Sequence, residues 1–319
     1  EYTFQYIFTN DNSDGQVNFE VIFSDSAGNS GDIVTGTTNS SYTIFDKIPP
    51  SDFTVQDVIT VGENSIANAW NSTNSAINII IPVSDDESLD SGRVQIIAKV
   101  ANNDFENLDN YHFFQSSDLN NSRIVSVSES LVESISGFSE NDTITISAII
   151  YDVPGNMTIG SESNTKLVIN QSIPIIINSN IESDFSDSSL AGVDNIITLI
   201  FETDTEIIIP SVTISGQEAI IVNLGDNEWQ ASYTMQSSDE DGIIPFVIDF
   251  MDVYGNPNSV INSTEDGTSV TFDNSKPSLS FVSIKSSNQD TTFAKVGDTI
   301  TIIFEADEVL TNQIASINS

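Results

Sequence analysis

Hydrophobic and polar residues alternate in short runs along most of the chain. Two of the clearest runs span residues 196–202 and 300–305, and clusters of Gly, Asn, Asp and Ser separate the runs. A period of two, in segments rich in Ile, Val, Thr and Phe, predicts short antiparallel β-strands. The pattern therefore predicts an all-β protein.

One motif recurs three times between these runs. It has the form Asp-x-x-Gly-Asn and occupies residues 25–29, 152–156 and 252–256. Glycine supplies the positive φ of a tight turn, and the Asp and Asn side chains can bind turn amides. A proline follows each copy after about twenty residues, and these prolines, spaced by 125 and 103 residues, are Pro49, Pro174 and Pro277. The motif thus marks an internal repeat.

A repeat of about 100 residues with about seven strands has the size of an immunoglobulin-like sandwich. We therefore predict tandem immunoglobulin-like β-sandwich domains arranged as a rod. The expected complete domains are 48–172, with a long loop near 101–122, and 173–275. Residues 1–47 are expected to be the C-terminal half of a domain, and residues 276–319 the N-terminal half of another. Residues 1–47 are assigned in this way because residues 2–4 and 14–15 resemble residues 233–235 and 241–242 in sequence.

A half sandwich cannot cover its own apolar face. One explanation is that the chain is an excerpt of a longer tandem array, which its start at Glu1 also favours. The other is that a neighbouring copy supplies the missing strands, as in strand complementation. The sequence leaves both explanations open.

Charge narrows the possible partners. The chain has 8 basic and 47 acidic residues, for a net charge of −39. Binding to nucleic acid or to anionic lipid depends on Lys and Arg, so this balance argues against both. The acidic surface is instead expected to concentrate small cations within a Debye length, about 8 Å at physiological salt.

Catalysis finds little support in the sequence. There is no Cys, and His112 is the one His, so thiolate metal sites and Cys nucleophiles are excluded and any triad must use His112. The nucleophile elbow, the phosphate loop and the His-Glu-x-x-His motif are all missing. No apolar run reaches the eighteen or so residues of a membrane span. We expect a protein that is not an enzyme, in which His112 packs in a loop or at an edge.

Several segments together resemble a known kind of repeat. They are residues 225–235 with Trp229, the turn at 252–256, and residues 272–277 and 294–301. They are similar to the tandem immunoglobulin-like repeats of prokaryotic cell-surface proteins. The acidic, Lys-poor, Asn- and Ile-rich composition looks most like the surface-layer (S-layer) protein of an ammonia-oxidising marine archaeon.

This resemblance implies an extracellular protein at the cell surface. Its role would be structural, as a segment of an S-layer lattice in which copies of the protein are one another's partners. The lattice would form a negatively charged, porous coat that attracts small cations. Two alternatives stay open, namely the stalk of a calcium-stiffened bacterial adhesin and an accessory module of a secreted polysaccharide-degrading enzyme.

Calcium, or another divalent cation, is the expected ligand, because calcium sites combine several carboxylate and carbonyl oxygens. The candidate ligands lie in the turns, at the terminal strands and in acidic clusters. They are Asp25, Asp152 and Asp252, then Asp46 and Asp273, then Glu202, Asp204, Glu305 and Asp307. The competing interpretation is that each turn aspartate binds the amides of its own turn.

Overall fold

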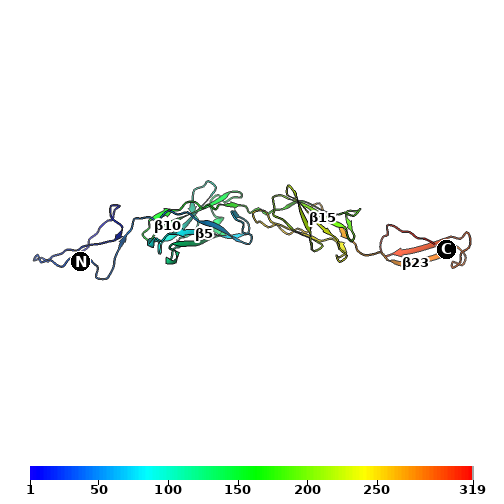
Figure 1. Cartoon of the computed structure of the whole chain (residues 1–319), viewed down its shortest axis with the longest axis horizontal. Coiled ribbons are helices and arrows are strands. Elements are labelled where there is room, and N and C mark those ends of the chain that lie inside the picture. Colours follow the sequence, from blue (N-terminus) through cyan, green and yellow to red (C-terminus); the bar gives the residue numbers. More distant parts are fainter. Residues whose placement is uncertain (318–319) are drawn as a thin grey trace. The chain divides into compact units, whose positions relative to one another are not determined.

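The computed structural model describes residues 1–317, which form strands joined by turns and loops (Figure 1). The chain divides into two compact units. The first comprises Glu1–Pro174 together with Met251–Asn258, and the second comprises Ile175–Phe250 with the residues from Ser259 onward. Helical segments in the described part are short, and they are η1 (Glu87–Leu89), η2 (Ser116–Asp118) and α1 (Glu129–Val132). None of residues 1–317 lies in a helix with the length and hydropathy needed to cross a membrane.

The first unit contains a sandwich of two sheets, which are antiparallel except where β12 pairs with β4 in parallel. One sheet has the strand order β3-β5-β9, from β3 (Asp57–Gly62), β5 (Asn74–Val83) and β9 (Asn121–Ser128). The other has the order β4-β12-β10-β6-β7, with β11 beside β10 and β8 beside β6. Its strands are β4 (Ala69–Trp70), β6 (Arg93–Val100), β7 (Glu106–Asn107), β8 (His112–Phe113), β10 (Thr143–Tyr151), β11 (Met157–Ile159) and β12 (Leu167–Ile169). The sequence predicted a loop near 101–122. The structure has two short strands there, β7 and β8, which the sequence did not indicate.

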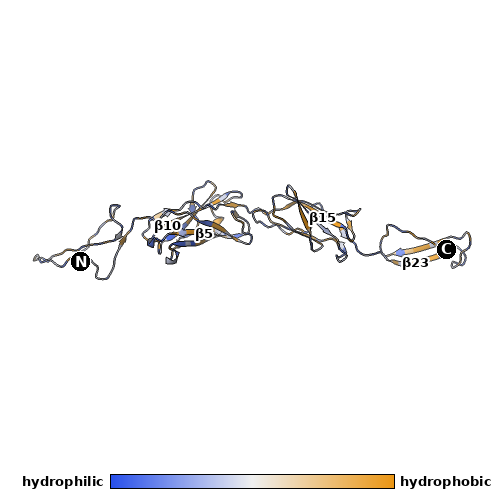
Figure 2. Ribbon diagram, in the orientation of Figure 1, coloured by the Kyte–Doolittle hydropathy of each residue, from blue (hydrophilic) through white to orange (hydrophobic). Residues whose placement is uncertain are grey.

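The period of two explains the core between these sheets. In β5, every second residue from Ile77 to Ile81 is fully buried, whereas the residues between them are half-buried. Figure 2 shows hydrophobic residues along the strands of this unit. Trp70 is also fully buried, and its Nε1 donates to the Glu133 carboxylate at 3.3 Å. A buried indole needs such a partner for its N–H. One continuous apolar cluster runs from Val55 to Ile169.

The second unit contains a second sandwich, whose apolar cluster runs from Ile176 to Phe272. One sheet has the order β13-β15-β19-β18, and the other side consists of the three-stranded pieces β14-β22-β20 and β17-β16-β21. The first sheet is formed by β13 (Ile176–Ser183), β15 (Ile196–Thr203), β18 (Ile220–Gly225) and β19 (Glu228–Thr234). The pieces opposite are formed by β14 (Leu190–Ala191), β16 (Ser211–Ile214), β17 (Gln217–Glu218), β20 (Gly242–Ile243), β21 (Phe246–Asp249) and β22 (Thr271–Phe272).

The strand order is that of the immunoglobulin fold. In that fold strands A, B, E and D form one sheet and strands C, F and G form the other. In the second sandwich β13, β15, β19 and β18 take the places of A, B, E and D. The C, F and G positions are taken by β16, by β20 with β21, and by β22. The predicted class, an all-β chain of tandem immunoglobulin-like sandwiches, is confirmed.

The segments at the two ends each form a small sheet. At the N-terminal end β1 (Gly15–Gln16) pairs with β2 (Ile44–Phe45). At the C-terminal end β23 (Leu279–Ser286) pairs with β24 (Ile300–Ala306). Both segments expose large apolar side chains, and neither segment contributes a buried hydrophobic residue to a core.

Leu199→Ala tests the second core. Leu199 is fully buried in β15, so we expect the free energy of unfolding of this sandwich to fall by about 2–5 kcal/mol. Trp229 lies in this sandwich and Trp70 in the first, so urea unfolding followed by fluorescence in a Trp70→Phe background reports on the second alone. The control is Ile209→Ala, at a residue 78% exposed, with an expected change within about 0.5 kcal/mol. Equal effects of the two changes would contradict the assigned core.

Candidate functional site: the Asp-x-x-Gly-Asn turns

The three repeated turns close on their own aspartate in the same way. In the third turn, Asp252 Oδ1 accepts hydrogen bonds from the amides of Tyr254 (2.9 Å) and Asn256 (2.8 Å). The Asn256 side-chain amide donates to Asp252 Oδ2 at 2.9 Å. The corresponding side-chain bonds from Asn156 to Asp152 and from Asn29 to Asp25 measure 2.8 and 2.9 Å. The carboxylates therefore serve as acceptors for their own turns.

Glycine is required in the third turn for two reasons. Gly255 has a φ of +91°, in the left-handed region that side chains disfavour. A β-carbon at this position would also lie 2.7 Å from the Asn64 carbonyl oxygen, which is too close for any side chain. The glycine thus permits both the turn and its close approach to residues 64–72.

The third turn is bound to the end of the first sandwich. The segment Met251–Asn258 belongs to the first compact unit. The Asn256 side-chain amide donates to the backbone carbonyl (3.0 Å) and to the side-chain oxygen (2.8 Å) of Asn170, the residue after β12. In return, the Asn256 side-chain oxygen accepts from the amide of Ser72 at 2.8 Å. One asparagine therefore links the turn to two segments of the first sandwich.

Asn71 completes this polar cluster. Its side-chain amide donates to the carbonyls of Tyr254 and Asn64, both at 2.7 Å. Asn71, Asp252 and Asn256 are all buried. Burial of polar groups is unfavourable unless they form hydrogen bonds, and here the three side chains bind one another's segments. The cluster therefore holds the turn in one position.

The second turn makes the equivalent contact. Asp152 is fully buried, and the Asn156 side-chain amide donates to the carbonyl of Asp46 at 3.2 Å. Asp46 follows β2 as Asn170 follows β12, so the asparagine of the second and of the third turn binds the residue after the last strand of the preceding repeat. In the first turn Asp25 and Asn29 are exposed and bind each other.

The remaining predicted calcium ligands either accept hydrogen bonds from backbone amides or lie in strands. Their carboxylates accept backbone amides as follows: Asp46 from Ile48, Asp273 from Ser275, Asp204 from Ile175 and Asp307 from Ser278. Glu202 lies in β15 and Glu305 in β24. Among residues 1–317 no three His, Asp or Glu side chains come together in a group that could hold a metal ion. Calcium binding stays a prediction.

Sequence reasoning missed two residues of the site. Asn170 had a signal, because it occupies the place of Asp46 and Asp273 after the last strand of a repeat. Asn71 had none, since it lies in the polar stretch 71–75, and its role depends on the approach of a turn about 180 residues later.

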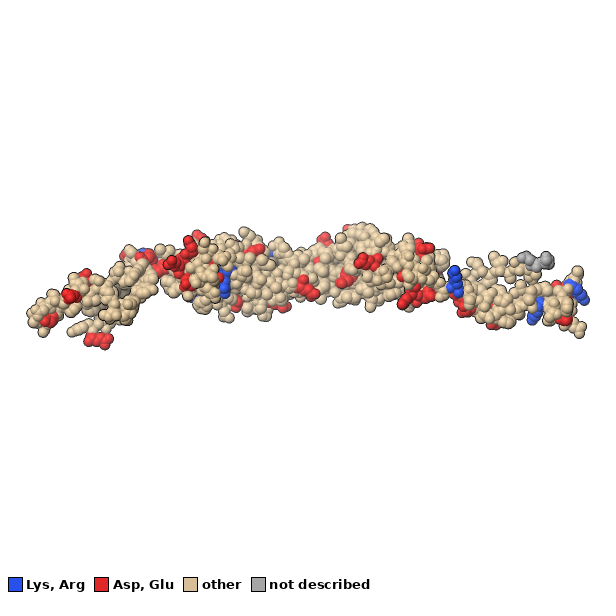
Figure 3. Space-filling model, turned by 60° about the horizontal axis from the view of Figure 1, so that its bottom comes forward, with Lys and Arg blue, Asp and Glu red and all other residues tan. Residues whose placement is uncertain are grey.

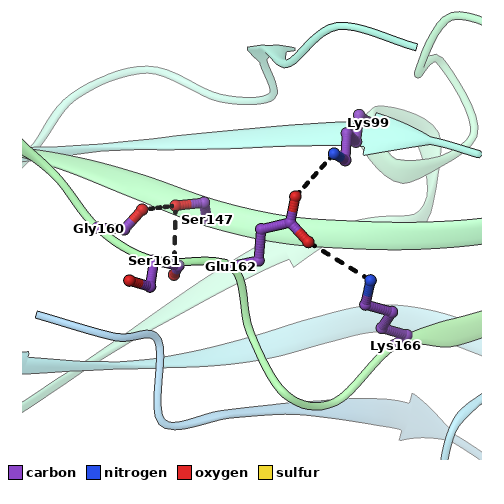
Figure 4. A network of polar contacts seen from close by, with 6 residues as sticks. All are labelled: Lys99, Ser147, Gly160, Ser161, Glu162 and Lys166. Carbon is purple, nitrogen blue, oxygen red and sulfur yellow. Dashed lines mark hydrogen bonds and ion pairs between the residues drawn. The ribbon is translucent and has the colours of Figure 1, made fainter. Parts of the chain in front are cut away.

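Basic residues of the first sandwich are paired. Figure 4 shows the Glu162 carboxylate between the ammonium groups of Lys99 (2.7 Å) and Lys166 (3.4 Å). The hydrogen bond from Lys99, followed by that from Lys166, lowers the pKa of Glu162. The Arg93 guanidinium lies over the rings of Tyr111 and Tyr151, at 4.8 and 4.5 Å. With 8 basic and 47 acidic residues, most carboxylates of the chain therefore have no Lys or Arg partner.

Fold and turns together define a chain of tandem immunoglobulin-like modules with hydrogen-bonded repeat ends. No family model matches the chain, and no curated protein matches its sequence. Among solved structures, a 1.5-MDa bacterial ice-binding adhesin aligns at 17% identity over 83% of this chain and 76% of that one, with a TM-score of 0.39.

Two further structures show weaker similarity. Fibronectin(III)-like modules of Clostridium thermocellum CbhA align at 11% identity over 68% of this chain and 94% of theirs, with a TM-score of 0.32. SGBP-B of the Bacteroides ovatus mixed-linkage glucan utilization locus aligns at 12% identity over 85% and 63%, with a TM-score of 0.19. TM-scores this low do not support a fold assignment. The assignment made above depends on the strand order of this chain alone.

Asn256→Ala tests the buried turn. Removing the side chain leaves Asp252 Oδ2, the Asn170 carbonyl and the Ser72 amide without this partner. We expect the free energy that protects the Ser72 amide from hydrogen exchange to fall by about 1–3 kcal/mol. The matched control is Asn29→Ala in the exposed turn, for which we expect a change in stability within about 0.5 kcal/mol. An unchanged Ser72 protection in Asn256→Ala would show that the contact does not hold the turn.

Asn29→Ala also tests the electrostatics of the first turn. The side-chain hydrogen bond from Asn29, and next its backbone amide, hold the pKa of Asp25 below its usual range. A lowered pKa in the folded state means that the turn gains stability above the unfolded pKa and loses it as the pH falls through the folded one. We expect the variant to raise the Asp25 pKa toward its ordinary value, as read from the carboxyl carbon in an NMR titration. A pKa that does not move would contradict the assigned bond.

Proposed function

We propose that this chain is a structural segment of an extracellular cell-surface protein. In this proposal copies of the protein associate side by side into an S-layer lattice, which forms a porous, negatively charged coat. The observation that carries the proposal is the repeated turn whose asparagine binds the end of the preceding repeat, at Asp46 and again at Asn170. Such a contact recurs at the same place in two repeats, which suits a scaffold built from repeated modules.

Buried polar contacts suit this role better than apolar ones. A hydrogen-bonded cluster has one preferred geometry, because each donor must meet its acceptor. Asn71 and Asn256 satisfy this condition with four bonds between segments far apart in the chain. The proposed scaffold therefore gains specificity at its repeat ends.

The charge supports the proposed coat. The net charge of −39 is spread over the whole chain, and Figure 3 shows Asp and Glu scattered over the face in view, with few Lys and Arg. Such a surface raises the local concentration of small cations and lowers that of anions. Within the proposal, small cations are thus the second partner after other copies of the chain.

The proposal includes no catalytic activity. His112 begins β8, and its Nε2 lies 2.9 Å from the carboxylate of Asp109, three residues earlier in the chain.

A stalk of an adhesin is the second candidate. The bonded repeat ends would serve it equally well, because a stalk also needs modules held in sequence. The two roles differ in lateral association, since a lattice requires contacts between chains and a stalk does not.

Electron microscopy distinguishes the two roles. We expect the chain to form ordered sheets in calcium that dissolve after chelation. The control is a parallel sample with magnesium in place of calcium. Separate chains in every condition would exclude the lattice and favour the stalk, and sheets that survive chelation would exclude a divalent cation as the link.

Cation selectivity tests the coat itself. Across isolated layers we expect sodium or ammonium to pass faster than chloride, with a difference that shrinks as salt is raised, because salt screens the surface charge. Equal permeability to anions at low salt would contradict the proposed cation-attracting coat.

A further inference from the structure

The larger sheet of the first sandwich carries a row of side chains that crosses four strands on its outer face. Phe113 of β8 lies opposite Arg93 of β6, which lies opposite Tyr151 of β10. Tyr151 in turn lies opposite Met157 of β11. Directly opposite residues share one face of a sheet. The next residue of β6, Val94, is buried in the core, so the row faces away from the core.

Arg93 is held in this row by two aromatic rings. Its guanidinium carbon lies 4.8 Å from the centre of the Tyr111 ring and 4.5 Å from that of the Tyr151 ring. The two rings meet edge to face, with their centres 5.8 Å apart. A contact between a cation and a ring face is electrostatic and occupies none of the five N–H donors with an acceptor. The head group is therefore held in position while its donors remain available.

Arg93 differs in this respect from the other basic residues of the first sandwich. Lys99 and Lys166 pair with Glu162, and Arg123 lies 3.6 Å from the Asp118 carboxylate. Within residues 1–317 the Arg93 side chain has neither an ion pair nor a hydrogen bond, and its nitrogens reach solvent. In a chain with 47 acidic residues, this guanidinium is available to a carboxylate from another molecule.

Exposed apolar side chains lie on both sides of the guanidinium. Phe113 is 62% exposed and Tyr111 is 47% exposed. Beyond Tyr151, Met157 and Ile159 are each more than half exposed. Tyr and Arg are among the residue types that dominate binding energy at interfaces, and a contiguous exposed apolar patch marks an interaction site. The row therefore has the composition of a binding surface with one cation within it.

The shape of this surface favours an extended glycan over a peptide. Neighbouring strands lie about 4.8 Å apart, so the row from β8 to β11 spans about 14 Å. Strands β6 and β10 have partners on both sides, so their backbone groups are used within the sheet. A peptide that adds to a sheet needs free backbone groups at an edge. A sugar ring can pack its C–H face on an aromatic side chain and keep its hydroxyls in water.

We propose that this row binds an acidic polysaccharide, with a hexuronic acid residue at Arg93. The carboxylate of that sugar accepts two parallel hydrogen bonds from the guanidinium, which is the geometry that an arginine fork provides. Neighbouring sugar rings pack on the exposed rings of Phe113 and Tyr111. The ligand is recognised by its carboxylate and by its apolar faces together.

The acidic surface of the chain restricts the kind of glycan. The net charge of −39 repels a polyanion, and salt screens this repulsion beyond about 8 Å. The contact between Arg93 and a carboxylate is much shorter than that length. A glycan in which uronic acids alternate with uncharged sugars therefore fits the chain better than one with a charge on every ring.

A hyaluronan hexasaccharide, in which glucuronic acid alternates with N-acetylglucosamine, tests the carboxylate contact by calorimetry on the full chain in about 0.15 M salt. The matched ligand is the same hexasaccharide with its carboxyl groups reduced to alcohols. We expect the acidic form to bind about tenfold more tightly than the reduced form. Arg93→Gln is expected to abolish this difference. Lys166→Gln removes the same charge from the same sandwich and is expected to preserve it.

Phe113→Ala tests the aromatic part of the site. We expect several-fold weaker binding of the acidic and the reduced hexasaccharide alike, because ring packing does not depend on the carboxylate. Phe185→Ala removes a 47% exposed ring from the second sandwich and is expected to leave both affinities unchanged. Urea unfolding followed by Trp70 fluorescence, in a Trp229→Phe background, checks that the first sandwich is intact in each variant.

Three results would overturn the proposal. They are no binding of the acidic hexasaccharide, equal binding of the two forms, and a preference for the acidic form that survives Arg93→Gln. Tighter binding of a Glu-rich peptide than of the hexasaccharide would assign the row to a protein partner and would overturn it as well. The site does not depend on lateral association, so ordered sheets and acid-selective binding can each be observed without the other.

Discussion

Burial of one face of each sheet against another sheet is the constraint on which the rest of the structure depends. Where two sheets meet, alternate residues such as Ile77 and Leu199 are removed from water, and the intervening residues are free to carry charge. The same pattern in the end segments finds no second sheet within the described chain, so their aromatic and aliphatic residues are exposed. Cores, acidic surface and unpaired faces therefore have one cause.

The turns add polar specificity to this apolar scaffold. A hydrophobic face accepts many partners of similar shape, whereas Asn256 requires a carbonyl, an amide and a carboxylate at fixed positions. Its counterpart Asn156 binds a carbonyl at the same place in the repeat. The chain thus uses burial to form each module and hydrogen bonds to define where the next turn meets it.

This division of roles also bears on the acidic residues. Aspartates predicted as metal ligands accept hydrogen bonds from the amides of their own turns, as Asp252 shows. The charge of the molecule is consequently a property of its surface as a whole. That collective charge and the repeated modules are the two features on which the proposed structural role depends.

By itself the sequence determined the all-β class, the repeat, the positions of the closing turns and the acidic surface. Each of these is encoded locally, by a period of two, by Asp and Asn four residues apart, or by composition. Only the tertiary structure decided that Asn71 and Asn170 bind the third turn and that β7 and β8 extend a sheet within a predicted loop. The physical reason is that these contacts join segments distant in the chain. Which groups come within hydrogen-bond distance is decided by folding, and the local sequence does not show it.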